Sequence, residues 1–166
     1  MTIYIFYIVS IFAHAAILNL TQKNKNLMLF LLFCQLTFIS GFRKSIGGDT
    51  QVYVELFRNI RNLDLQNTLS LGYESGFLLY CYLLSRLFQD PQAIIFATST
   101  IINFIIFLQI YKRSRMPWLS VLLYFTLLYY FTFMNLMRFG IASSILFVAV
   151  DYLKDGKPIK FIILVL

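Results

Sequence analysis

The stretch Trp118–Val150 reads WLSVLLYFTLLYYFTFMNLMRFGIASSILFVAV and contains one charged residue, Arg138. A run this apolar is typical of membrane-spanning helices, which need about 20 apolar residues each. With its extension to Leu153 the run is long enough for two crossings, and Asn135–Gly140 is the natural place for a break. A permanent charge at membrane depth needs a partner, a water-filled cavity or an anionic ligand, so Arg138 is a candidate site residue. The alternative is an interfacial arginine between two helices.

The composition indicates the same class of protein. Of the 166 residues, 60% are hydrophobic and only 13% are charged, far from the balance of a soluble domain. The net charge is +7, but the basic residues punctuate apolar segments as topogenic charges do, so we exclude nucleic acid as a partner. Cys34 and Cys81 lie in apolar segments without metal-ligand spacing, which predicts buried structural thiols and no metal site.

Several further apolar segments accompany this run, and we predict an all-α fold, a multi-pass transmembrane helical bundle that forms one domain over residues 1–166. The further segments are Thr2–Asn19, Leu27–Phe42, Phe77–Phe88, Ala93–Tyr111 and a last one that begins at Ile159. The apolar run Phe161–Leu166 is too short to cross a bilayer. We therefore expect the sequence to be the N-terminal part of a longer protein, truncated at its C-terminus.

One sizeable polar region, residues 43–75, follows the second apolar segment. Within it, apolar residues recur every four positions from Val52 to Ile60, which predicts a short amphipathic helix on the membrane surface. Asp49 or Thr50 can serve as the N-cap of this helix.

The distribution of basic residues favours one topology. If every apolar segment crosses the membrane, residues 23–25 and 112–115 fall on opposite sides, which gives a poor charge bias. If Phe77–Phe88 is instead a partial helix that enters and leaves on one side, the clustered basic residues all become cytoplasmic. These residues are Lys23, Lys25, Lys112, Arg113, Arg115, Lys154, Lys157 and Lys160. The loop 43–75 and Arg138 then share the outer face, and we prefer this arrangement.

Two polar strings could carry chemistry. GFRKSIGGDT, from Gly41 to Thr50, combines two cations, a flexible turn, a carboxylate and a helix start, which together favour an anion such as a diphosphate. Asp49 in this string could act as an acid or base, or pair with Arg43; the alternative is a helix cap with interfacial anchors. Glu74 lies directly before the partial helix, where a carboxylate often only complements the helix dipole.

These strings resemble the EpsG family of bacterial exopolysaccharide and capsule proteins, which is similar to the Wzy class of polymerases. The resemblance rests on GFRKSIGGDTQVY (residues 41–53), YESGF (73–77), DPQ (90–92), and NLMR (135–138) followed by Ile141-Ala142. Family members usually carry Gln after the arginine that Arg138 matches, whereas this chain has Phe139.

The resemblance implies a multi-pass enzyme of the bacterial cytoplasmic membrane that polymerises undecaprenyl-diphosphate-linked repeat units by glycosyl transfer. Its implied partners are this lipid-linked oligosaccharide, the bilayer, and other polysaccharide assembly and export proteins. A sugar hydroxyl would attack the anomeric carbon and lipid diphosphate would depart, a reaction that requires no cofactor, nucleotide or metal. The implied substrate-binding residues are Arg43, Gly48, Tyr53 and Arg138, with Tyr53 on a sugar. Asp49 would be the base or would orient Arg43, and Glu74 is a second acidic candidate.

Two other functions fit the same sequence. One is a non-enzymatic transport or scaffold component of polysaccharide export, in which Arg138 is a structural counter-ion or a translocation charge. The other is a glycan ligase, which transfers finished chains to another acceptor.

Overall fold

The computed structural model describes residues 9–10, 13, 25–44 and 47–165, and within these ranges every regular element is a helix. The all-α prediction is confirmed for this part of the chain. The predicted first segment, Thr2–Asn19, falls almost wholly outside the described residues. The helices are α2 (Lys25–Gly41), α3 (Thr50–Arg61), α4 (Leu65–Leu69), α5 (Ser75–Leu87), α6 (Gln92–Arg113), α7 (Pro117–Thr126), α8 (Tyr129–Asn135), α9 (Met137–Lys154) and α10 (Pro158–Val165).

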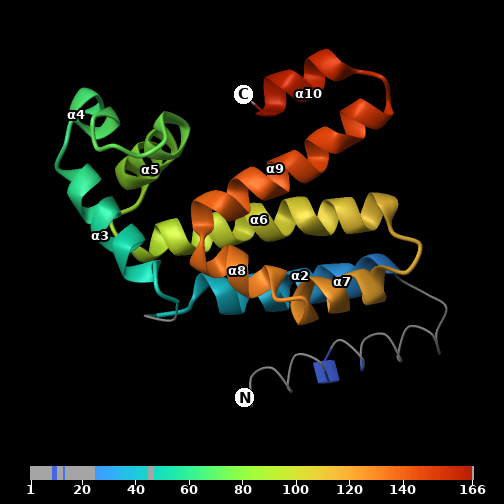
Figure 1. Cartoon of the computed structure of the whole chain (residues 1–166). Helices are drawn as coiled ribbons and strands as arrows, with labels where there is room; N and C mark the ends of the chain where they lie inside the picture. Colours follow the sequence, from blue (N-terminus) through green and yellow to red (C-terminus); the bar gives the residue numbers. More distant parts are fainter. Residues whose placement is uncertain (1–8, 11–12, 14–24, 45–46, 166) are drawn as a thin grey trace.

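The helices α2, α6 and α9 form a bundle, α3, α4 and α5 gather at one end of it, and the short α10 packs against α9. α6 packs against α2 on one side and α9 on the other, while α7 and α8 complete the bundle beside them (Figure 1). α3, α4 and α5 lie together near the start of α6. By length and composition, α6 is the one single helix in the described ranges that could span a membrane. α7 and α8, bent by 54°, could be a second, broken span.

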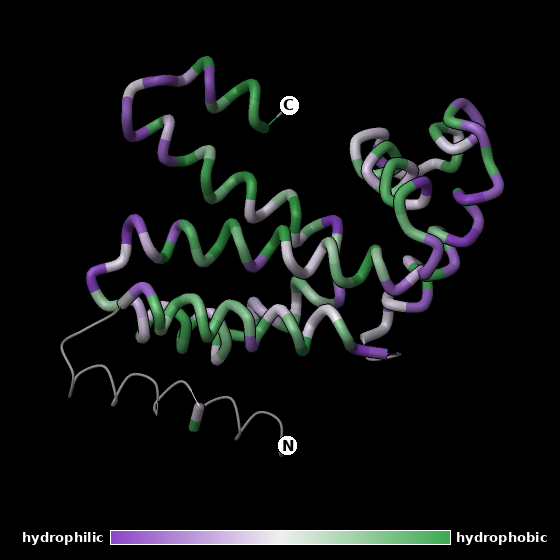
Figure 2. Tube along the Cα trace, turned by 180° about the vertical axis from the view of Figure 1, so that it is seen from behind, coloured by the Kyte–Doolittle hydropathy of each residue, from purple (hydrophilic) through white to green (hydrophobic). Residues whose placement is uncertain are grey.

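The long helices expose apolar side chains and bury polar ones. Phe30, Phe38 and Phe104 are exposed, whereas Asn103 and Gln109 of α6 are buried. Figure 2 shows the hydrophobic colour along the middle of these helices and the hydrophilic colour at their ends. This arrangement is expected where lipid is the solvent, because buried polar groups then find partners inside the bundle.

The run from Trp118 to Leu153 is broken twice. The predicted break within Asn135–Gly140 is confirmed, since α8 ends at Asn135 and α9 begins at Met137. A second break separates α7 from α8 at Leu127 and Leu128, where the sequence has neither glycine nor proline. Leu128 adopts φ +64°, a left-handed conformation that costs an L-residue about 1–2 kcal/mol.

The polar region and the partial helix form the short-helix cluster. The predicted amphipathic helix is α3, but its apolar side, including Tyr53, Phe57 and Ile60, is buried in a core shared with α5 and the start of α6. Protein therefore covers this apolar side, and the position of the helix on the membrane surface stays a prediction. α5 has 13 residues and is about 20 Å long, too short for a 30 Å hydrocarbon core, as predicted for a partial helix.

The two cysteines differ in their environments. Cys81 is buried in the core of the short-helix cluster, as predicted, whereas Cys34 is exposed on α2. The prediction of a buried thiol was wrong for Cys34 because α2 is apolar around its whole circumference, so its sequence does not reveal which side packs inward.

The two ends of the bundle differ in character. α2 begins and α6 and α9 end at one end, where the Arg113 guanidinium lies 3.1 Å from the Asp151 carboxylate (Figure 1). The opposite end holds the short-helix cluster and the α8–α9 break (Figure 1), and Arg43, which follows the end of α2 and donates to the Met134 carbonyl, lies there too. The preferred topology requires the basic clusters at one end of the bundle and the loop 43–75 with Arg138 at the other, and the described residues are arranged in this way. Lys23, which belongs to one of the basic clusters, lies outside the described residues.

Candidate functional site

The Arg138 guanidinium, in the first turn of α9, meets the carboxylate of Glu74. Arg138 Nη1 lies 2.9 Å from Glu74 Oε1 and 2.6 Å from Oε2, and Arg138 Cζ lies 5.0 Å from the centre of the Tyr73 ring. The two side chains are 37% and 67% exposed. The hydrogen bond from Arg138 holds the pKa of the Glu74 carboxyl below its usual value. Arg138 is therefore paired at an open end of the bundle, where a ligand can reach it.

The Arg138 guanidinium keeps unused hydrogen-bonding capacity. Its Nε is buried and donates to no acceptor. Every other buried side-chain nitrogen or oxygen atom in the described ranges has a hydrogen-bond partner. The Tyr53 side chain also interacts with this guanidinium, through a side-chain hydrogen bond and a favourable electrostatic interaction. Because this Nε is buried, an external anion such as a phosphate would reach the guanidinium through its exposed part.

Arg43 has a different environment from Arg138, although both were predicted to bind diphosphate. Its side chain is 4% exposed, and burial lowers the pKa of its guanidinium to about 10, so the group stays charged at neutral pH. Nη1 donates to the Ser40 carbonyl at 2.9 Å, Nε to Thr50 Oγ1 at 3.4 Å, and Nη2 to the Met134 carbonyl. The donors of Arg43 are thus directed at protein acceptors.

The loop before α3 packs against the α8–α9 break. Gly47 adopts φ +101°, and a Cβ built on it would overlap Asn135 Oδ1. No atom lies within 4 Å of a Cβ built on Gly48, so the loop is open there. The structure therefore brings Gly47, Gly48 and the segment that precedes Arg138 to the same end of the bundle.

Asp49 is half-buried at the N-terminus of α3. Its carboxylate forms no capping hydrogen bond with the helix, and Arg43 bonds to Thr50 instead. Within the described ranges no ion pair or hydrogen bond of this carboxylate is present. Asp49 takes the N-cap position of α3, as one of the two residues predicted for it, although its side chain makes no capping bond; the prediction that it pairs with Arg43 was wrong, because Thr50 Oγ1 accepts from that guanidinium. The role of Asp49 as a base stays a prediction.

Tyr53, predicted to contact a sugar, is 3% exposed and packs edge-on against Phe77 with ring centres 5.8 Å apart. A ring face buried in this way is not presented to a ligand. Tyr73, whose ring borders the Arg138 guanidinium, is more exposed and was missed. Its position directly before Glu74 was the available signal.

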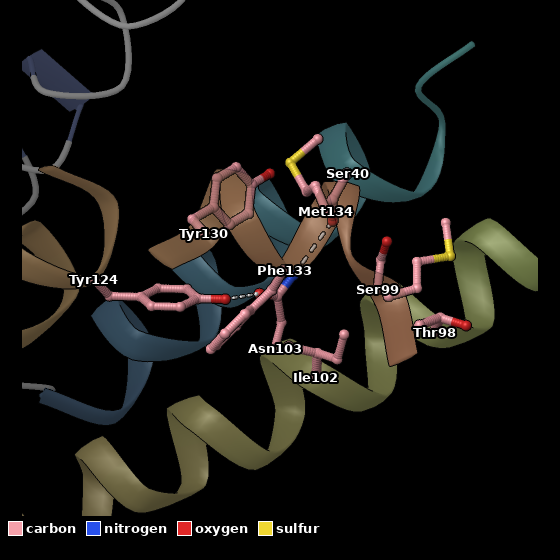
Figure 3. A pocket seen from close by; sticks show the side chains of 10 residues that line it. Ser40, Thr98, Ser99, Ile102, Asn103, Tyr124, Tyr130, Phe133 and Met134 are labelled. Carbon is pink, nitrogen blue, oxygen red and sulfur yellow. Dashed lines mark hydrogen bonds between the residues drawn. The ribbon is translucent and has the colours of Figure 1, made fainter. Parts of the chain in front are cut away.

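A buried polar network lies next to Arg43, and Figure 3 shows its members Ser40, Ser99, Asn103 and Tyr124. Asn103 Nδ2 donates to Ser40 Oγ at 3.3 Å, and the Tyr124 hydroxyl donates to Asn103 Oδ1 at 3.2 Å. Ser99 of the same network accepts from Arg43 Nη1 at 3.5 Å. The cavity between these side chains measures about 10 Å³, room for one water but not for a sugar. Sequence reasoning missed the network, although Asn103 is a polar residue within an apolar segment.

The described residues contain no group of three or more His, Cys, Asp and Glu side chains that could hold a metal ion. The chemistry that they offer is that of a cation beside one carboxylate, Glu74, with Asp49 as a second carboxylate at the start of α3. Arg138 can bind an anion, and Glu74 and Asp49 can accept protons.

Comparison with known proteins identifies the family. The EpsG family model matches residues 26–166, so the chain belongs to the EpsG family, and the resemblance stated above is confirmed. It is therefore a membrane protein related to polysaccharide biosynthesis. No curated protein and no solved structure matches the chain.

Proposed function

We propose that the chain polymerises repeat units of a capsule or exopolysaccharide that are carried on undecaprenyl diphosphate. The observation that carries this proposal is the Arg138 guanidinium, which is partly exposed and lies beside the Glu74 carboxylate at an open end of the bundle. A glycosyl transfer from lipid diphosphate needs both kinds of group, a cation on the departing diphosphate and a carboxylate near the attacking hydroxyl.

The proposed site faces the outside of the bacterial cytoplasmic membrane, and the chain crosses that membrane several times. The ends of α6 and α9 and the start of α2 carry clustered basic residues, which favours the cytoplasm for that end of the bundle. The site lies at the other end. In this arrangement α2, α6, the bent α7–α8 pair and α9 cross, and the short-helix cluster of α3, α4 and α5 stays on the outer side.

Substrate binding exchanges one anion for another on Arg138. An exposed ion pair such as Arg138–Glu74 contributes about 0–1 kcal/mol, and a diphosphate carries more charge and more acceptors than one carboxylate. The diphosphate therefore displaces Glu74 from the guanidinium. Gly48 leaves space for the lipid headgroup to approach the loop.

The chemical step then uses the freed carboxylate. The acceptor sugar hydroxyl attacks the anomeric carbon of the donor, a new glycosidic C–O bond forms, and the C–O bond to the diphosphate breaks. The proton of the hydroxyl passes to Glu74, or to Asp49 as the second acidic candidate. Undecaprenyl diphosphate leaves with the electron pair, and Arg138 stabilises its charge.

The products that accumulate without the protein test this function. A deletion strain should accumulate single repeat units on lipid, and the full-length gene should restore long chains. Long chains on lipid would instead identify a glycan ligase, and residual polymer of altered length would identify a transport or scaffold component. Either result would overturn the proposed polymerase.

A further inference from the structure

The α8–α9 break leaves backbone groups that need partners. α8 ends at Asn135, so the carbonyls that follow Thr132, which still accepts from the Leu136 amide, lack the amide donors that a continuous helix would supply. In lipid such groups must be satisfied within the protein, and helix breaks persist only where this happens. The Met134 carbonyl belongs to this turn, and it accepts a hydrogen bond from Arg43 Nη2.

Arg43 lies between the C-terminal ends of two helices. Besides Met134 at the end of α8, it donates to the Ser40 carbonyl in the last turn of α2. Helix C-termini carry partial negative charge, so the two ends together stabilise a buried cation that has no carboxylate partner in the described ranges. Further bonds to Ser99 of α6 and Thr50 of α3 tie the same guanidinium to two more helices.

The break that Arg43 caps also determines where Arg138 lies, because α9 begins at Met137. We propose that Arg43 is a positioning residue, which caps the end of α8 and thereby holds the start of α9 so that Arg138 faces Glu74. Arg43 does not contact the diphosphate, since its donors are directed at protein acceptors and its side chain is 4% exposed. The capping role is independent of the substrate, whereas its effect on catalysis rests on the proposed function.

A thiol probe at the start of α9 can test this role. Phe139 is exposed in the first turn, so Phe139→Cys in the full-length protein reports how α9 begins, with exposed Cys34 replaced by serine. Buried Cys81 stays in place as an internal reporter of an intact fold. Membrane vesicles are treated with a membrane-impermeant maleimide, and the labelling rate of the introduced thiol is measured with Arg43 present and with Arg43→Gln.

We expect Arg43→Gln to change the labelling rate of the introduced thiol by about fivefold or more, because an uncapped helix end opens more often. Arg43→Lys should give an intermediate rate, since an ammonium retains the charge but not the fork of donors. Arg86→Gln is the matched control. Arg86 donates to the Arg61 and Leu63 carbonyls, away from the break, so the rate should stay within about twofold.

Unchanged labelling of the introduced thiol in both Arg43 variants would overturn the positioning role, most clearly if both variants also lose polymer. If Arg43→Gln exposes Cys81 to the reagent, the comparison uses Arg43→Lys, which keeps the cation between the helix ends. Arg43-dependent labelling in a protein that makes no polymer even with its natural sequence would refute the proposed function and leave the capping role intact.

Discussion

Replacing Arg138 by lysine tests the proposed site with little disturbance of the fold. The Arg138 side chain is 37% exposed, and once Glu74 leaves Nη1 the guanidinium can offer a diphosphate directed donors where an ammonium offers a point charge. A hydrogen bond to a charged group contributes about 1.5–3 kcal/mol. Loss of one such contact should lower the polymerisation rate by roughly 10- to 150-fold, at about 1.4 kcal/mol per tenfold.

The fold should tolerate this change. The Arg138–Glu74 pair is exposed on both sides, so it contributes at most about 1 kcal/mol to the free energy of unfolding. The assay is the amount of polymer per unit of membrane-inserted protein in a deletion strain that carries the full-length variant gene. Phe139→Leu, one residue away, is the control for a general effect on α9. Wild-type polymer from Arg138→Ala would refute the assignment of Arg138 to the diphosphate.

Glu74→Gln should reduce the amount of polymer by about 100-fold or more if the carboxylate accepts the proton. The affinity for inorganic pyrophosphate, measured by calorimetry, should stay equal or increase, because Arg138 Nη1 is released from its ion pair. The folded-state pKa of Glu74 lies below its usual value of 4.5. The stability from its ion pair is therefore present above pH 4.5 and is lost as the pH falls toward the folded-state pKa. The melting temperatures of wild type and Glu74→Gln should accordingly converge in acid. Asp49→Asn should leave the stability of α3 unchanged, because the side chain makes no cap; unchanged polymer would exclude Asp49 as a base. Gly47→Ala should destabilise the loop by about 1–2 kcal/mol or more through its positive φ and the overlap with Asn135. Gly48→Ala should be neutral in the same thermal melts, and equal effects at both glycines would contradict the packing described.

The parts of this fold that the sequence predicted follow from solvent preference. Apolar runs gave the helical class, and the polar residues around Asn135 gave one break, whereas the topology drawn from the basic clusters stays a prediction. The break at Leu127 and Leu128 has no such signal, because neither residue favours a left-handed backbone. Tertiary packing imposes that conformation, and local sequence does not report it.

The candidate site was predicted in composition but not in its pairing. Glu74 and Arg138 are separated by 64 positions, and only the packing of α5 beside the start of α9 brings them into contact. The sequence placed Asp49 near Arg43, yet neighbours in sequence at a helix start need not bond, and the Thr50 hydroxyl occupies that guanidinium instead.

The two arginines show why residue type alone does not separate a ligand from a scaffold. Both lie in family motifs and both are permanently charged, so the sequence assigned them the same role. In lipid, however, an unsatisfied carbonyl at a broken helix is itself a strong acceptor, and a nearby guanidinium can bond to it without any ligand from outside the protein. Arg43 lies between two helix C-termini and has used its donors there, whereas Arg138 lies in the first turn of a helix, where the backbone offers amide donors and no free carbonyl. An anion is therefore expected at Arg138, because the adjacent amide groups and the cation both attract negative charge. By capping the end of α8, Arg43 holds the start of α9 where Arg138 can bind this anion.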